Sequence, residues 1–128
     1  MKLAPYAYVD DTPFTTTPEQ LLARLGPPRR RARNDVQLDE LDYGHTVYRF
    51  QDSGRLEEVT RRTPVLHLEQ VAVPFAALAG FIRSQDPEAF ERAGFLVSPR
   101  YGLAFVPREP DWVTALAAHC IPTWRALA

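Results

Sequence analysis

The chain has 128 residues, of which 45% are hydrophobic and 11% are aromatic. This size and composition indicate one folded domain over residues 1–128 with a real core, and they exclude a disordered protein. Fifteen Lys and Arg residues against sixteen Asp and Glu give a formal charge of −1. That balance argues against a nucleic-acid binder, because such proteins gain affinity mainly by neutralising phosphates.

The N-terminus and the cysteine content indicate a compartment. The first residues, MKLAPYAYVDD, lack the apolar stretch of a signal peptide, and no later run is long enough to span a bilayer. Cys120 is the only cysteine, so no intrachain disulfide can form and a reducing compartment is indicated. We therefore expect a cytoplasmic protein that binds no membrane.

The stretch TTTPEQLLARLGPP predicts a short helix in the first half of the chain. Thr17 can cap the helix, Gln20 completes a capping box three residues later, and Pro18 suits the first helical position. Gly26 can adopt the left-handed conformation that ends a helix, and the two prolines after it prevent continuation.

The acidic segment DVQLDELDYG, residues 35–44, predicts a strand with a change of phase. Val36 and Leu38 alternate together, whereas Leu41 and Tyr43 have the opposite parity. This change predicts either a β-bulge near residues 39–40 or a strand end there.

The next segments predict a β-hairpin over about residues 45–61. HTVYRF alternates, with Tyr48 and Phe50 on one side, and RLEEVTR returns after the turn QDSG, where Gly54 is available for positive φ. The stretch PVLHLEQVAV, residues 64–73, is rich in aliphatic and β-branched residues and predicts another strand.

Three further helices are predicted in the second half. Pro74 opens the first, over residues 74–84, and Asp86-Pro87 is a cap and first-position pair for a short helix over 87–93. A final helix over about residues 111–120 would carry one apolar side, made of Trp112, Val113, Leu116 and Cys120.

Between the second and the last of these helices, the stretch GFLVSPRYGLAF predicts a hairpin. Its turn, SPRYG, is explained by Pro99, which fixes φ, by Gly102, which permits a left-handed residue, and by the capping hydroxyl of Ser98. Helices mixed with strand neighbours joined by tight turns are typical of the α+β class. We expect an antiparallel sheet of about five to six strands, with three to four helices packed mainly on one face.

No catalytic, cofactor or metal signature is present in the sequence. His45, His67 and His119 show no paired ligand spacing, and a zinc site needs three or four converging ligands. His119 and Cys120, as helix neighbours about 100° apart, would not point together. Cys120 is therefore interpreted as a small buried hydrophobic residue rather than a nucleophile. We expect no catalytic residue, no cofactor and no metal.

Three charged features are candidates for contact with a partner. The carboxylates of Asp39, Glu40 and Asp42 can form an acidic docking surface if they face outward. The arginine run at residues 29–33 includes Arg29 and Arg31. We interpret it as a solvated loop, and its alternative role is to form a phosphate or anion site or to contact an acidic partner.

The third feature lies in the SPRYG turn. Arg100 and Tyr101 are not required by the turn, and both residue types are enriched at interface hot spots. We therefore expect a structural hairpin whose tip contacts a partner.

The order of the predicted elements resembles one kind of bacterial protein. A capped helix ending in LGPP leads to an acidic strand, to YGHTVYRF and GRLEEVT, and to an apolar helix, GFLVSPRYGLAF and a terminal helix with tryptophan. Over most of residues 12–125 the chain resembles the small cytoplasmic immunity proteins encoded beside secreted toxins of contact-dependent or type VI systems. TPEQLLARLGPP followed by strands also looks like the helix-then-sheet modules of β-lactamase-inhibitor-like and BamE-like proteins.

The resemblance to immunity proteins implies a non-enzymatic inhibitor whose partner is a cognate toxin domain, neutralised by masking of its active site. One alternative is a small ligand-binding or enzymatic domain, with a pocket between sheet and helices lined by Tyr43, Tyr48, Arg49 and His67. Another is an assembly adaptor that forms homo-oligomers through a sheet edge.

Overall fold

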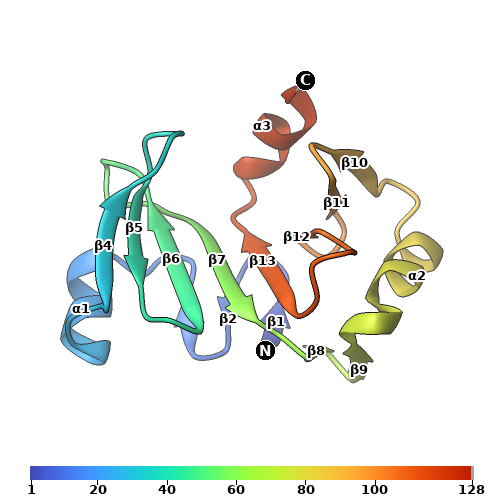
Figure 1. Cartoon of the computed structure of the whole chain (residues 1–128), viewed down its shortest axis with the longest axis horizontal. Helices are drawn as coiled ribbons and strands as arrows, with labels where there is room; N and C mark the ends of the chain where they lie inside the picture. Colours follow the sequence, from blue (N-terminus) through green and yellow to red (C-terminus); the bar gives the residue numbers. More distant parts are fainter. Residues whose placement is uncertain (128) are drawn as a thin grey trace.

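The fold is mostly β, as a computed structural model of residues 1–127 shows. Within these residues the chain forms thirteen strands in two sheets and three short helices. The expected α+β class, with one sheet of about five to six strands and three to four helices, is therefore wrong. Figure 1 shows the larger sheet running from β4 on the left to β10 on the right, with the first strands of the chain behind it.

The larger sheet is antiparallel throughout. Its strands, in spatial order, are β10 (Phe90–Arg92), β11 (Phe95–Ser98), β12 (Leu103–Phe105), β13 (Trp112–Leu116), β7 (Leu56–Arg62), β6 (Thr46–Phe50), β5 (Asp39–Asp42) and β4 (Arg30–Arg33). We call it the large sheet.

The smaller sheet is built from the N-terminus and the middle of the chain. Its strands, in spatial order, are β3 (Thr12–Pro13), β2 (Tyr8–Val9), β1 (Lys2–Ala4), β8 (Val65–Leu68) and β9 (Val71–Pro74). β1 and β8 are parallel, and the other neighbours are antiparallel. We call it the small sheet.

The main core lies between the inner face of the large sheet and the small sheet. The helices α1 (Pro18–Leu25) and α2 (Phe75–Gln85) contribute fully buried Leu21 and Leu78 to this core. The third helix, α3 (Cys120–Ala126), packs on the outer face of the large sheet, against a smaller cluster around Leu116. Part of the outer face beside α3 is thus left without a covering layer.

Several local predictions are confirmed. In α1, the Thr17 hydroxyl accepts a hydrogen bond from the Gln20 amide at 3.2 Å, and the Thr17 amide donates to the Gln20 side chain at 3.0 Å. The hairpin predicted at residues 45–61 is β6–β7, and Gly54 in its turn has φ 87°. The helix predicted at residues 74–84 is α2, and the later hairpin is β11–β12.

The prediction of a helix at residues 111–120 is wrong, because this segment is the central strand β13. β13 lies between β12 and β7 and is buried on both faces, so its sequence is a nearly continuous apolar run rather than an alternating one. Such a run does not distinguish a strand from a buried helix. The last helix begins only at Cys120, and Pro122 lies in its first turn, where a missing N–H is tolerated.

The helix predicted at residues 87–93 is also wrong. The Asp86 side chain accepts a hydrogen bond from the Glu88 amide at 2.9 Å and forms a turn instead of a helix cap. Strand β10 follows, and Ala93 and Gly94, both at positive φ, close a tight hairpin with β11.

Three further strand assignments differ from the sequence predictions or make them more specific. The arginine run is not a loop but the edge strand β4, paired with β5. The change of phase in the acidic segment is a strand end, since β5 begins at Asp39. The single strand predicted at residues 64–73 is the hairpin β8–β9, turned at Glu69, which has φ 52°.

Candidate functional site

The predicted acidic and basic contact residues lie next to each other at the β4 edge of the large sheet. Arg31 donates two hydrogen bonds to Asp39, at 2.7 and 3.3 Å. Glu40 accepts a hydrogen bond from Arg49 at 2.6 Å, and Asp42 accepts one from the Gly44 amide at 2.7 Å. These carboxylates are thus engaged within the chain, as is expected where opposite charges lie across paired strands.

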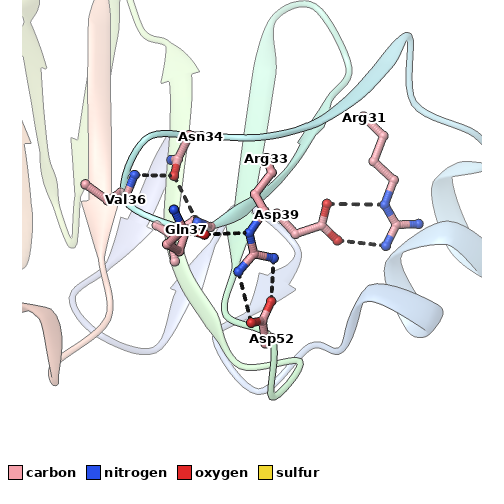
Figure 2. A network of polar contacts seen from close by, with 8 residues as sticks. Arg31, Arg33, Asn34, Val36, Gln37, Asp39 and Asp52 are labelled. Atoms are coloured by element: carbon pink, nitrogen blue, oxygen red, sulfur yellow. Dashed lines mark hydrogen bonds and ion pairs between the residues drawn. The ribbon is translucent and has the colours of Figure 1, made fainter.

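The same edge is tied to the turn of the β6–β7 hairpin. Figure 2 shows Arg31 facing Asp39, and Arg33 forming a two-point ion pair with Asp52 at 2.6 and 2.9 Å. The Arg33 guanidinium lowers the pKa of Asp52 below its ordinary value. Arg29 lies at the start of this edge, where its amide donates to the Asp42 carbonyl at 2.8 Å and its side chain lies against Gly44.

Arg100 and Tyr101 lie elsewhere, in the β11–β12 turn, on the far side of β13, β7 and β6. The Tyr101 ring packs against Phe81 at 5.7 Å between centroids, and the Arg100 guanidinium lies over the Tyr101 ring at 5.4 Å. The structure does not bring these residues together with the acidic and basic residues at the β4 edge.

The turn that carries Arg100 is fixed by a buried carboxylate. Asp86 accepts hydrogen bonds from the Ser98 hydroxyl at 2.7 Å and from the Arg100 amide at 3.0 Å. Ser98 in turn accepts from the Tyr101 amide at 3.2 Å, as predicted for a capped turn. This turn is a structural corner with two side chains at its tip.

The pocket residues of the alternative enzymatic interpretation are dispersed as well. Tyr48 is buried in the main core, with the ring of Tyr43 edge-on at 5.8 Å. Arg49 points to the outer face of the large sheet, and His67 is exposed on the small sheet. These four residues do not line a common pocket.

A groove that the sequence did not predict lies on the outer face of the large sheet. Its cavity volume is about 380 Å³. We call this cavity the outer groove, and its lining residues are Arg49, Glu58, Thr60, Phe95, Val106, Glu109, Trp112, Thr114 and Trp124.

The floor of the outer groove is a row of linked polar side chains. Arg49 donates to Thr60 at 2.6 Å as well as to Glu40, and the hydroxyls of Thr60 and Thr114 are 2.8 Å apart. The row runs across β5, β6, β7 and β13, which are neighbours in the large sheet. Because each hydroxyl and the guanidinium are positioned by a neighbour, the floor is preorganised.

The walls of the outer groove are aromatic and acidic. Trp112 is 38% exposed, and the ring of Trp124 packs edge-on against Phe95 at 5.1 Å. Within residues 1–127, Glu58 and Glu109 form no ion pair at 4.0 Å or less. Burial raises the pKa of Glu58 above its ordinary value, and the nearby Arg49 acts in the opposite direction.

A second cavity, of about 410 Å³, is lined by residues of α3 and of the β4–β5 loop, and we call it the α3 cavity. It shares Glu58 and Trp124 with the outer groove. Its apolar lining includes Val36, which is 70% exposed at the tip of the β4–β5 loop. Glu57, His119 and Cys120 line its polar side.

Glu57 is positioned by an irregularity in β7. Arg49 pairs with Glu58 and Phe50 pairs with Leu56, so Glu57 is the extra residue of a β-bulge. Its side chain is only 4% exposed. The Glu57 carbonyl accepts hydrogen bonds from the Ala117 amide at 2.9 Å and from the Cys120 thiol at 3.4 Å.

The expectation that His119 and Cys120 point apart is wrong, because both contact the Glu57 carboxylate. The Cys120 Sγ lies 3.1 Å from Oε2 of Glu57, and Nε2 of His119 lies against the same oxygen. His119 has helical backbone dihedrals just before α3, so the spacing of the pair does not bring them together; they meet because both side chains reach one carboxylate oxygen. The potential ligand atoms of the three residues lie within 4.8 Å of one another.

The surroundings of Cys120 disfavour a nucleophilic role. Burial, together with the hydrogen bond to the Glu57 carboxylate, raises the pKa of the Cys120 thiol far above its ordinary value. The thiolate is the nucleophilic form, and these surroundings disfavour it in the free thiol.

Sequence reasoning missed both cavities and most of their residues: it named Arg49 only as part of a different pocket, and it set His119 and Cys120 aside as ligands. Glu57 and Glu58 are adjacent acidic residues on a strand, a pattern usually read as a solvated face. The misassigned segment 111–120 hid the fact that Trp112 and Thr114 share a strand face. The bulge at Glu57 left one signal, which is that Leu56 and Val59 are both apolar although their parity differs.

Comparison with protein-family models, with curated proteins and with solved structures finds no match to this chain. Within the residues that the structure describes, no helix has both the length and the apolar character needed to cross a membrane.

Proposed function

We propose that this chain is a non-enzymatic binding protein of the cytoplasm that neutralises a cognate bacterial toxin by covering its active site, and that the outer groove is its contact surface. The observation that carries the proposal is the combination in one groove of an exposed Trp112 with two carboxylates, Glu58 and Glu109, that form no ion pair within residues 1–127. Partly exposed tryptophans around a preorganised polar floor are typical of interface hot spots.

The charge of the outer groove specifies the chemistry of the partner. Arg49, its central cation, is already paired with Glu40 at 2.6 Å. The unpaired groups in the groove are carboxylates, and indole rings attract cations over their faces. We therefore propose that the partner presents Lys or Arg side chains from a basic active-site cleft.

The non-enzymatic part of the proposal is supported by the state of the reactive groups. The Cys120 thiol is held protonated by burial and by the Glu57 carboxylate. His119 faces that same carboxylate rather than the thiol, so the imidazole is not directed at the sulfur. An inhibitor that acts by contact needs neither group to react.

The experiment is a binding titration of this chain against a catalytically inactivated toxin domain encoded by the adjacent gene, followed by rescue of cells that express the active toxin. Trp112→Ala should weaken binding by roughly tenfold or more, the scale of a hot-spot residue. Glu109→Lys should slow association because it places a like charge opposite the basic partner.

Matched controls separate the outer groove from other surfaces. Tyr8→Ala removes a comparably exposed aromatic residue from the small sheet, and Glu88→Lys reverses an exposed charge in the turn after α2. Both should bind as the wild type does. Arg100→Ala tests the SPRYG turn as a competing contact surface. If Arg100→Ala lost binding while Trp112→Ala bound normally, the interface would lie at the SPRYG turn and not in the outer groove. If the wild-type chain did not bind the toxin domain, the proposal would be refuted.

A further inference from the structure

The cluster beside the α3 cavity, in which Glu57 is buried and His119 is partly exposed, has the composition of a metal site. It joins an imidazole nitrogen of His119, the sulfur of Cys120 and a carboxylate oxygen of Glu57, all within 4.8 Å of one another. In a tetrahedral zinc site the ligand atoms lie roughly 3.5 Å apart, as follows from metal–ligand distances of about 2.0–2.3 Å. The 3.1 Å separation of Sγ and Oε2 is close to that spacing.

The nitrogen of His119 faces the same carboxylate oxygen as the thiol. Nε2 is fully buried and lies directly against Oε2 of Glu57, while the rest of the imidazole is partly exposed. The Cys120 thiol points to that oxygen as well. A cation bound by the nitrogen, the sulfur and the oxygen would replace this direct contact and hold all three atoms as ligands.

The two oxygens of Glu57 have different surroundings. Oε1 lies 3.6 Å from the Arg55 guanidinium, whereas Oε2 faces His119 and Cys120. Carboxylates that bind metals are commonly held in place by a second residue that does not touch the metal. Arg55 can hold Oε1 in this way and leave Oε2 for the metal. The backbone also holds the site, because the bulge at Glu57 fixes its strand and the Ala117 carbonyl accepts from the Cys120 amide at 3.0 Å.

We propose that Glu57, His119 and Cys120 bind one Zn²⁺ ion through Oε2, Nε2 and Sγ, with the fourth coordination position directed to the α3 cavity. Nitrogen and sulfur donors with one carboxylate suit zinc better than the hard cations Mg²⁺ and Ca²⁺, which prefer oxygen ligands only. Binding replaces the thiol proton by the metal, so that a Zn–S bond forms as the S–H bond breaks and the proton passes to solvent.

The test is a titration of the full chain, freed of any affinity tag, with Zn²⁺ and with Co²⁺ as a spectroscopic substitute. We expect one ion per chain, with a near-ultraviolet thiolate-to-cobalt band and the intense visible bands of tetrahedral cobalt. Cys120→Ser and His119→Gln should each weaken Zn²⁺ binding by more than about 100-fold, since loss of an outer-shell partner alone costs up to about that much.

The matched controls are His45→Gln and His67→Gln, which remove exposed histidines from other strands or loops. Both should bind Zn²⁺ as the wild type does. Circular dichroism of each variant identifies any that does not fold, and Cys120→Ser is the decisive variant because it removes the ligand with the least change in shape. A cobalt spectrum without a thiolate band, or Zn²⁺ affinity unchanged in folded Cys120→Ser, would overturn the proposal. The Zn²⁺ titration is independent of the test of toxin binding, because that test changes Trp112, which lies outside the cluster.

Discussion

At the scale of single residues, the carboxylate of Asp86 connects two separate parts of the chain. It is 3% exposed and accepts hydrogen bonds from the Glu88 amide, the Ser98 hydroxyl and the Arg100 amide. These bonds join the end of α2 to the β11–β12 turn. A charged acceptor in a buried position stabilises a fold more than a neutral one does.

We predict that Asp86→Ala lowers the free energy of unfolding by roughly 3 kcal/mol, because three donors lose their acceptor. Chemical denaturation with urea measures the change. The control is Asp11→Ala, at an exposed position, which should change the free energy by less than about 0.5 kcal/mol. Equal effects of the two substitutions would show that the Asp86 contacts contribute nothing.

Replacing glycine by alanine should have opposite effects on stability at Gly102 and at Gly80. Gly102 has φ 62°, and a Cβ there would lie 2.9 Å from the Tyr6 ring. Gly80 lies on the exposed side of α2, and a Cβ there would meet no atom within 4 Å. We predict that Gly102→Ala destabilises the protein by roughly 2 kcal/mol or more, whereas Gly80→Ala stabilises it by about 0.5–1 kcal/mol. Thermal unfolding of the two variants checks the signs, and the same sign in both would contradict this account.

At the scale of elements, the β4–β5 loop is attached to the neighbouring hairpin by Arg33 and Asp52. The guanidinium holds the pKa of Asp52 below its ordinary value of 3.8. A carboxyl whose pKa is lower in the folded state adds stability above its unfolded pKa and loses it as the pH falls through the folded value. The ion pair therefore stabilises the loop at neutral pH and not in strong acid.

We predict that Arg33→Gln returns the pKa of Asp52 to about 3.8, as measured by carboxyl NMR titration. The stability difference from the wild type should be present at neutral pH and disappear as the pH falls below the folded pKa. Arg30→Gln, in the same strand but without an ion pair to Asp52, is the control and should leave that pKa unchanged. An unchanged pKa in Arg33→Gln would mean that the pair does not persist in solution.

The elements also show which parts of the fold can be predicted from sequence. The helix α1 and the two long hairpins were predicted correctly because their signals are local: a capping box, an alternating pattern and a turn glycine. The segment 87–93 was not, because the aspartate before its proline can form a turn as well as a helix cap. The segment 111–120 was not, because a short apolar run fits a helix and a buried strand equally well. Only pairing with distant strands decides between the two.

The candidate sites were beyond sequence reasoning for a related reason. Glu57 and His119 are far apart in the sequence. They meet only because a bulge in β7 directs Glu57 toward the start of α3. The small sheet has the same character, since β1 pairs in parallel with β8 across most of the first half of the chain. Contacts of this kind leave no local pattern.

At the scale of the whole molecule, the large sheet separates the main core from the face on which we propose the contact surface. Its inner face carries the main core, together with the small sheet, α1 and α2. Its outer face carries α3, the outer groove and the α3 cavity. Substitutions in the outer groove should therefore change recognition more than they change stability, because they leave the main core intact.

The chain contains two tryptophans, Trp112 and Trp124, and both line the outer groove. Their two indole N–H signals in an NMR spectrum therefore report directly on that surface. On addition of the inactivated toxin domain, we predict that both indole signals shift or broaden, while the backbone amide of Arg100 in the distant turn does not. Binding that leaves both indole signals unchanged would contradict the assignment of the outer groove as the contact surface.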